Sequence, residues 1–217
     1  SRRFHIRRGS SFLDFGCGNG YFLSVAKAHG MSVHWLEVNK AAAEYARNCL
    51  GVKVVAEPYH SIDGKDFDII TLWAVVEHLP KPGIILDLLK NHMHSKSILV
   101  IDTPTEDALF RKSIHLVNRI FKRRWFAPAL YQNRKGAHTQ CFDRRSIEVL
   151  LNRVGFEVID FEESTYGFKY MTKDIRSASI AAYIKKLIIF LGYVINLFVG
   201  HKNHMIVYAR LRDQISQ

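Results

Sequence analysis

Three glycines at alternate positions, directly after a short apolar run, are the residues of this sequence best suited to hold a ligand. The apolar run 12–15 leads into Gly16-Cys17-Gly18-Asn19-Gly20, and the helix-length stretch 21–29 follows. Glycine adopts positive φ angles and carries no Cβ that would collide with a ligand. The first N–H groups of a helix also have no partner within the helix. Strand, glycine loop and helix together predict a cofactor-binding loop.

The spacing of the glycines narrows the kind of ligand. G-x-G-x-G differs from the G-x-G-x-x-G of a pyrophosphate cradle. No Gly-Lys-Ser/Thr follows, so the loop is not a P-loop. Glu37 lies 17 residues after Gly20, at the end of the next apolar run. A carboxylate at that place can accept hydrogen bonds from both hydroxyls of a ribose, and we therefore expect a ribose-containing cofactor.

The elements that would position this loop alternate between short apolar runs and helix-length segments through the first hundred residues. This alternation is typical of a parallel sheet built from βαβ units. The second half adds two amphipathic helices and two further strands. The expected strands are 12–15, 32–37, 52–56, 67–72, 97–102, 156–161 and 205–211, and the expected helices are 21–29, 41–47, 83–93, 105–124 and 146–154.

Three segments, taken in order, resemble the class I S-adenosylmethionine-dependent methyltransferases, in the branch similar to the ubiquinone and menaquinone biosynthesis methyltransferases. They are the run from Phe12 to Gly20, the strand end Trp35-Leu36-Glu37-Val38-Asn39, and the segment 67–82, which contains Glu77-His78-Leu79-Pro80. Residues 138–143 show a weaker resemblance to the same family. The resemblance is specific over residues 10–105 and looser as far as residue 165.

The resemblance implies a single domain over residues 1–217 with a Rossmann-like α/β fold. Its sheet would have seven mostly parallel strands, with an antiparallel last strand, helices on both faces and extra helices after the fifth and sixth strands. The cofactor would be S-adenosyl-L-methionine, with the glycines around its methionine moiety and Glu37 on its ribose. The residues carried over to the cofactor site are Asp14, Gly16, Cys17, Gly18, Gly20, Glu37, Val38 (on the adenine), Glu57 (near the adenine amine), and Trp73 and Ala74 (beside the sulfonium).

Methyl transfer from a sulfonium requires mainly that the nucleophile, methyl and sulfur be aligned. A base helps when the nucleophile is a hydroxyl. His78 and His138 are the candidate catalytic bases. Both also have structural interpretations: His78 could brace the loop before Pro80, and His138 could be a surface residue. Glu77 could order the same loop, and Asp14 could be structural.

The three cysteines, Cys17, Cys49 and Cys141, show no CxxC or Cys/His ligand spacing. We therefore expect neither a disulfide framework nor a structural metal site. Free thiols suggest a reducing compartment, and the basic N-terminal stretch contains no apolar h-region. These features favour a cytoplasmic protein and leave open its attachment to the inner face of a membrane.

The chain is basic, with 31 Lys and Arg residues against 20 Asp and Glu residues and a formal net charge of +11. Such a charge suggests anionic neighbours such as lipid headgroups or nucleic acid. Residues 111–135 hold eight basic and no acidic side chains, within a predicted amphipathic helix at 105–124. That helix could be a lid, a membrane-facing surface or a packed element with a solvated face.

Residues 180–199 are apolar except for two lysines, one glycine and one asparagine. The uninterrupted apolar core is about half of the roughly 20 residues that a transmembrane helix needs. Packing inside the protein, packing in a homodimer and shallow contact with a membrane all remain open. We assign 105–135 and 176–203 as acceptor, lid or membrane-facing elements.

The sequence thus predicts a methyltransferase for a small-molecule or envelope-related acceptor, such as a lipid-linked or nucleotide-linked sugar or a quinol, with O-methylation preferred. An RNA methyltransferase is the second candidate, because the positive charge suits phosphate. Against this candidate, the sequence contains no Asn-Pro-Pro-Tyr-type signature and no added RNA-binding module. The third candidate is a non-catalytic cofactor-binding or membrane scaffold domain. The sequence identifies neither the acceptor nor the oligomeric state.

Overall fold

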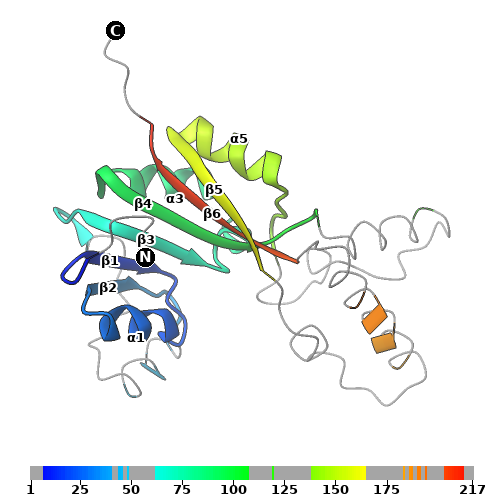
Figure 1. The fold of residues 1–217 in the computed structure, drawn as a ribbon, viewed down its shortest axis with the longest axis horizontal. Helices are drawn as coiled ribbons and strands as arrows, with labels where there is room; N and C mark the ends of the chain where they lie inside the picture. Colours follow the sequence, from blue (N-terminus) through cyan, green and yellow to red (C-terminus); the bar gives the residue numbers. More distant parts are fainter. Residues whose placement is uncertain are drawn as a thin grey trace, which may run out of the picture.

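The computed structural model describes residues 7–40, 62–107, 138–164 and 203–212, and single residues at 44, 45, 48, 119, 183, 186, 187, 190, 191 and 194. One six-stranded sheet runs through the described residues (Figure 1). Its strands are β1 (Ser11–Phe15), β2 (Ser32–Leu36), β3 (Phe67–Trp73), β4 (Met93–Pro104), β5 (Phe156–Ser164) and β6 (His204–Leu211), in the order β2-β1-β3-β4-β6-β5.

Strands β1 to β4 are parallel to one another, and β6 is antiparallel to both of its neighbours, β4 and β5. This mixed sheet confirms the predicted α/β architecture and the antiparallel last strand. The structure shows six strands rather than the expected seven among the described residues. The strand expected at 52–56 and most of the helix expected at 41–47 lie outside them.

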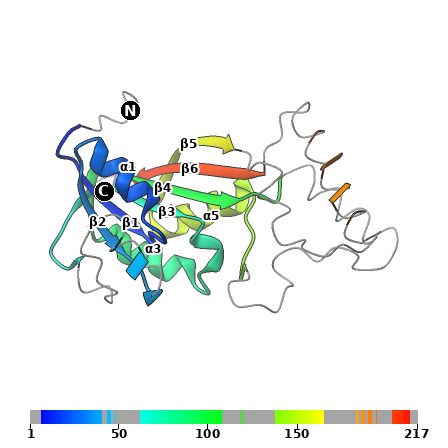
Figure 2. The same ribbon diagram turned by 90° about the horizontal axis from the view of Figure 1, so that it is seen from below.

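Helices cover both faces of the sheet, as predicted (Figure 2). Helix α1 (Tyr21–Ala28) packs on one face through Leu23 and Ala26. Helices α3 (Pro82–Lys90) and α5 (Arg144–Val154) pack on the other, where the larger apolar core lies. The strands fit this arrangement because most of β3 and the run 98–101 of β4, central in the sheet, are apolar, as expected of strands buried on both sides.

Local sequence signals explain the bounds of α5. Asp143 is the N-cap, and it exchanges hydrogen bonds with Ser146 in a capping box. The helix ends at Gly155, whose φ of 97° is left-handed. Glycine is favoured at that position because it has no Cβ to oppose this conformation.

Two predicted helix boundaries are wrong. The helix expected at 83–93 ends at Lys90, and Met93 already begins β4, because Asn91 and His92 form a turn that returns the chain to the sheet. The helix expected from Thr105 does not begin there: Thr105 forms a bridge with Phe142, and Glu106 donates its N–H to the Phe142 carbonyl. Residues 108–137, apart from the helical Arg119, lie outside the description.

Within the described part of the chain, no helix combines the length and the apolar character needed to cross a membrane.

Candidate active site

The predicted cofactor residues gather at one edge of the sheet. Because β1, β2 and β3 are parallel, their carboxyl ends lie together at that edge. The glycine loop follows β1, Glu37 follows β2, and Ala74 follows β3. Ligands of open α/β sheets bind outside this edge, so the topology gathers residues that the sequence could only place at separate strand ends.

The glycine loop has a left-handed backbone at all three glycines, with φ angles of 80°, 52° and 75° at Gly16, Gly18 and Gly20. A Cβ on Gly16 would lie 2.6 Å from Cγ2 of Val75, in the segment after β3. A Cβ on Gly18 would meet no atom within 4 Å. The loop therefore packs tightly against its neighbour at Gly16 and leaves open space beside Gly18.

Glu37 links the glycine loop to the end of β2. Its Oε2 accepts the backbone N–H of Gly18 at 2.8 Å, and its Oε1 accepts that of Asn39 at 2.7 Å. The side chain is buried, with 7% of the residue exposed. The Leu36 carbonyl accepts a further N–H from Gly16 at 2.7 Å. A buried carboxylate is thus held at the open side of the loop.

Asp14 lies beneath the loop, fully inside the protein. Its Oδ1 accepts the hydroxyl of Thr71, on the neighbouring strand, at 2.9 Å. Burial raises the pKa of Asp14 to about 7, and the charge of Glu37 acts in the same direction. Burial likewise raises the pKa of the Cys17 thiol to about 12. The thiol is neutral at physiological pH and therefore is not a nucleophile.

The turn after β3 carries backbone strain. Ala74 has a φ of 52°, and it is the one non-glycine residue with positive φ in the described chain. Such strain costs of order 1–3 kcal/mol and concentrates at functional sites. The ring of Trp73 stacks on that of Phe22, from α1, with centroids 4.0 Å apart. Val38, beyond Glu37, is 86% exposed.

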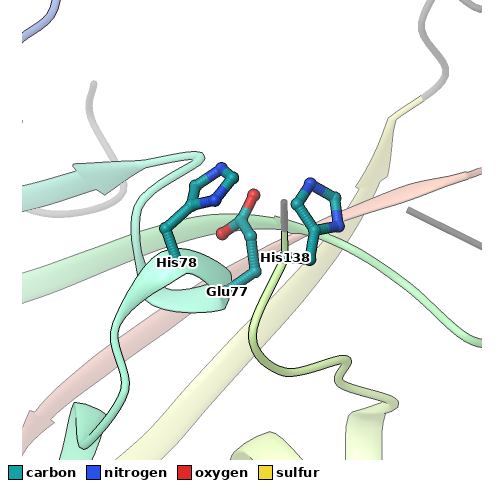
Figure 3. A group of neighbouring side chains, drawn as sticks. All are labelled: Glu77, His78 and His138. Atoms are coloured by element: carbon teal, nitrogen blue, oxygen red, sulfur yellow. The ribbon is translucent and has the colours of Figure 1, made fainter. Parts of the chain in front are cut away.

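The two predicted histidine bases lie side by side with Glu77 between them (Figure 3). The rings of His78 and His138 are 4.8 Å apart in an edge-to-face arrangement. The Glu77 carboxylate is buried and accepts the Thr103 hydroxyl at 3.1 Å. The N–H groups of Thr139 and Gln140 both donate to the Glu77 carbonyl, which fixes the segment after His138 against the turn after β3.

The ligand atoms of Glu77, His78 and His138 all lie within 4.8 Å of one another. Two imidazoles and a carboxylate can transfer a proton or coordinate a divalent metal ion. The sequence analysis expected no metal site, because it considered ligand spacing along the chain. These three residues come together only through the fold.

Comparison with known proteins gives the family. A family profile described as a methyltransferase domain matches residues 2–160. The chain belongs to the class I S-adenosylmethionine-dependent methyltransferases. A curated relative of this methyltransferase is the ubiquinone biosynthesis O-methyltransferase of Glaesserella parasuis serovar 5 (strain SH0165), which is 32% identical over 107 residues. The matched region is 44% of this chain and 45% of that protein, so the match spans less than half of the relative.

Solved structures share the fold of this methyltransferase. An S-adenosylmethionine-dependent methyltransferase from Archaeoglobus fulgidus aligns with 96% of this chain and 90% of its own, with a TM-score of 0.61 and 21% identity. A mycolic acid cyclopropane synthase complexed with SAH and CTAB aligns over 96% and 80%, with a TM-score of 0.66 and 15% identity. At these low sequence identities, the structural alignments show a common fold and no more.

Membership of this family assigns S-adenosyl-L-methionine as the cofactor of the methyltransferase. The residues present fit such a group. The space beside Gly18 admits a ligand close to the backbone, and the adjoining Glu37 carboxylate supplies the hydrogen-bond acceptor that a ribose needs. Glu57, predicted near the adenine, lies outside the described residues.

The sequence analysis did not predict one acid–imidazole pair at this edge. Nδ1 of His204, at the start of β6, lies 3.3 Å from Oδ2 of Asp102, near the end of β4. Both residues are buried. The nearest signal in the sequence is Asp102 at the end of an apolar strand, but the pairing with a residue about a hundred positions later follows only from the sheet register.

Proposed function

We propose that this methyltransferase transfers the methyl group of S-adenosyl-L-methionine to an oxygen of a small-molecule or envelope-related acceptor, such as a lipid-linked or nucleotide-linked sugar or a quinol. The observation that carries the proposal is the buried Glu37 carboxylate, hydrogen-bonded to Gly18 beside open space. The choice of oxygen is supported by the curated relative, which is named as an O-methyltransferase.

Glu37 is the proposed ribose ligand. Each of its carboxylate oxygens accepts one backbone N–H and keeps a second lone pair for a hydroxyl. Burial strengthens such hydrogen bonds, because competing water is excluded. Gly16, Gly18 and Gly20 would then surround the methionine moiety, which places the sulfonium toward the strained turn at Ala74.

Val38 and Trp73 complete the proposed cofactor site. The exposed side chain of Val38, next to Glu37, would gain burial by packing on the adenine. Trp73, stacked on Phe22, would form a rigid wall beside the sulfonium. The cofactor supplies an already activated methyl group. The protein then has to align the acceptor oxygen with it and exclude water.

His78 and His138 are proposed bases for the acceptor hydroxyl. They lie together where the segment 138–140 is fixed to the turn after β3 by the Glu77 carbonyl. The adjacent Glu77 carboxylate would stabilise an imidazolium formed by proton transfer. In this arrangement the two histidines can hold the acceptor hydroxyl, and either of them can accept its proton.

The proposed partner, besides the acceptor, is an anionic membrane surface on the cytoplasmic side. Tyr183, Leu187, Phe190 and Leu191 are helical and between 44% and 65% exposed, and their spacing places them on one helix face. We call these four residues the apolar stripe. Lys186 lies 6.0 Å from the ring of Tyr183. Apolar side chains beside lysine, on a chain of net charge +11, suit the interface of an anionic bilayer.

Calorimetric titration with S-adenosyl-L-methionine and S-adenosylhomocysteine tests the cofactor site. We expect saturable binding of both to the wild type. Glu37→Ala should weaken binding at least about tenfold, which corresponds to about 1.4 kcal/mol. Glu37→Gln should weaken it less, because one acceptor oxygen remains.

Asp87→Ala is the matched control, because Asp87 is an exposed carboxylate of α3 far from the glycine loop in the sequence. Its affinity should equal that of the wild type. Wild-type affinity in Glu37→Ala would remove the ribose role. Absence of binding to the wild type would defeat the proposed activity altogether. Once binding is measured, incubation with quinols and lipid-linked sugars identifies the acceptor class by mass spectrometry.

A further inference from the structure

The buried pair Asp102 and His204 lies at the same edge of the sheet as the cofactor residues. Asp102 is paired in register with Trp73, the last residue of β3. His204 is paired with Pro104, the last residue of β4, because antiparallel β6 begins where β4 ends. His204 therefore lies two residue pairs further toward the edge than Asp102. The carboxylate supports the imidazole from the interior of the sheet.

The pair also faces the side of the sheet that carries the glycine loop's helix. Side chains of residues paired in register point to the same face. Asp102 is paired with Trp73 on one side and Ile206 on the other, and both belong to the cluster that packs under α1. Asp102 also accepts the N–H of Ala74 through its carbonyl, at 3.0 Å. The pair thus adjoins the strained turn proposed to lie beside the sulfonium.

Structural stability alone gives little reason for this pair. The side chains of His204 and Asp102 are 10% and 5% exposed. Removing two ionisable groups from water is costly, and an apolar pair of similar volume is often as stable. A carboxylate beside one ring nitrogen of a histidine instead serves to fix which nitrogen carries the proton, a functional use of such a pair.

A second observation on this face points to a ligand. Nε1 of Trp73 is buried and has no hydrogen-bond partner in the structure, as far as it is described. A buried donor without a partner is costly, and a ligand oxygen would satisfy it. A donor and an imidazole on the same face of the sheet suit an acceptor that carries a hydroxyl group.

We propose that His204, held by Asp102, is the base that removes the proton from the acceptor hydroxyl. The proposal rests on the proposed methyl transfer to oxygen and names the group that activates that oxygen. His204 is the catalytic residue, and Asp102 is a positioning residue. Nδ1 faces Asp102, so the proton from the acceptor goes to Nε2. The proton then goes to His204 in place of His78 or His138, and those two histidines bind or orient the acceptor.

The atoms and charges of the step balance. The acceptor O–H bond breaks and its proton passes to Nε2 of His204. The oxygen forms its bond to the methyl carbon while the sulfur–methyl bond breaks, and the sulfur keeps that electron pair. The imidazolium is stabilised by the Asp102 carboxylate until it releases the proton to water. This arrangement of carboxylate, imidazole and hydroxyl is that of an oriented general base.

The first test uses no acceptor. Nitrogen NMR of histidine-labelled protein saturated with S-adenosylhomocysteine reports the tautomer of His204. The signals of His204 are identified as those missing from the spectrum of His204→Gln. We expect the neutral ring to carry its proton on Nδ1, facing Asp102, and Asp102→Asn to shift the population toward the other tautomer. A neutral ring protonated on Nε2 would overturn the proposal, because Nε2 could not then accept a proton.

The second test compares acceptors of different acidity. With an isoprenyl-substituted quinol, His204→Gln should lower kcat by about 10²–10⁴-fold. With a nitro-substituted quinol that is already ionised at the assay pH, the loss should be less than tenfold. Equal losses for both acceptors, or no loss for the first, would overturn the proposal.

Matched variants separate this role from folding and from the cofactor site. His92→Gln changes another buried histidine, whose Nδ1 contacts the Lys65 carbonyl at the opposite end of β4, and should leave kcat unchanged. His204→Gln should bind S-adenosylhomocysteine like the wild type. If the wild type binds no cofactor, the proposed function fails. If binding is normal and the two tests above fail, only the role of His204 fails.

Discussion

The Glu37 carboxylate accepts the N–H of Gly18 at 2.8 Å, and this contact joins two motifs that the sequence could only place at separate strand ends. It holds the middle glycine of the loop against the end of β2. The same carboxylate is the proposed ribose ligand, so loop geometry and cofactor binding are coupled. A change at either residue should affect both.

Gly16→Ala should destabilise the fold more than Gly18→Ala. Both substitutions would place alanine in the left-handed region, which costs about 1–2 kcal/mol of stability. Only the Gly16 Cβ would also collide, 2.6 Å from Val75 Cγ2. Urea denaturation should show this difference. The double variant Gly16→Ala/Val75→Ala should be more stable than the two single effects predict, by about 0.5–3 kcal/mol. Strict additivity would contradict the contact.

Asp14→Asn should change how stability depends on pH. The folded pKa of Asp14 is raised from 3.8 to about 7 by burial. Its stabilising contribution is therefore complete below pH 3.8 and is lost as the pH rises to about 7. The free energy of unfolding of the wild type should fall relative to Asp14→Asn by about 1 kcal/mol per pH unit in this window. Denaturation curves at several pH values measure this. Parallel profiles for the two proteins would contradict it.

Asp143→Ala should weaken α5. Asp143 Oδ1 accepts the Ser146 N–H at 2.7 Å, and the hydrogen bonds from Ser146 lower the pKa of Asp143. Loss of the cap should cost about 1 kcal/mol. Because the folded pKa is lowered, the carboxylate contributes above its unfolded pKa and this contribution is lost as the pH falls through the folded value. The difference from the wild type, measured by thermal unfolding, should shrink below pH 4. Asp143→Asn retains a capping oxygen and should be close to the wild type at neutral pH.

Leu187→Gln/Leu191→Gln should reduce binding to vesicles of mixed phosphatidylglycerol and phosphatidylcholine. The change removes two members of the apolar stripe and leaves the charge unaltered. Flotation should fall several-fold, and added salt should lower wild-type binding as well, because it screens the lipid charge. Ile84→Gln is the control, since Ile84 is 60% exposed on α3. Equal flotation of the stripe variant and the control would remove the stripe from the membrane proposal.

Much of the fold was predictable because its signals are local. Each described strand overlaps an apolar run that predicted it, and α1 and α5 end within two residues of a glycine. At the two wrong boundaries, backbone pairing overrode local helix propensity: Met93 pairs with Phe67 in the sheet, and Thr105 forms an isolated bridge with Phe142. The long β4 is stabilised by hydrogen bonds to both neighbouring strands, β3 and β6. The residue pattern within β4 itself does not indicate these neighbours.

The sequence by itself predicted the glycine loop and the acidic residue after the second strand as a cofactor site and, together with the segment 67–82, indicated the family. These features depend on residues close together in the chain, where glycine and carboxylate chemistry can be read directly. Only the tertiary structure decided that Val75 lies against Gly16, that His78 meets His138, and that Asp102 meets His204. Those contacts depend on strand order and register, which are set by the packing of both faces of the sheet and not by any one segment.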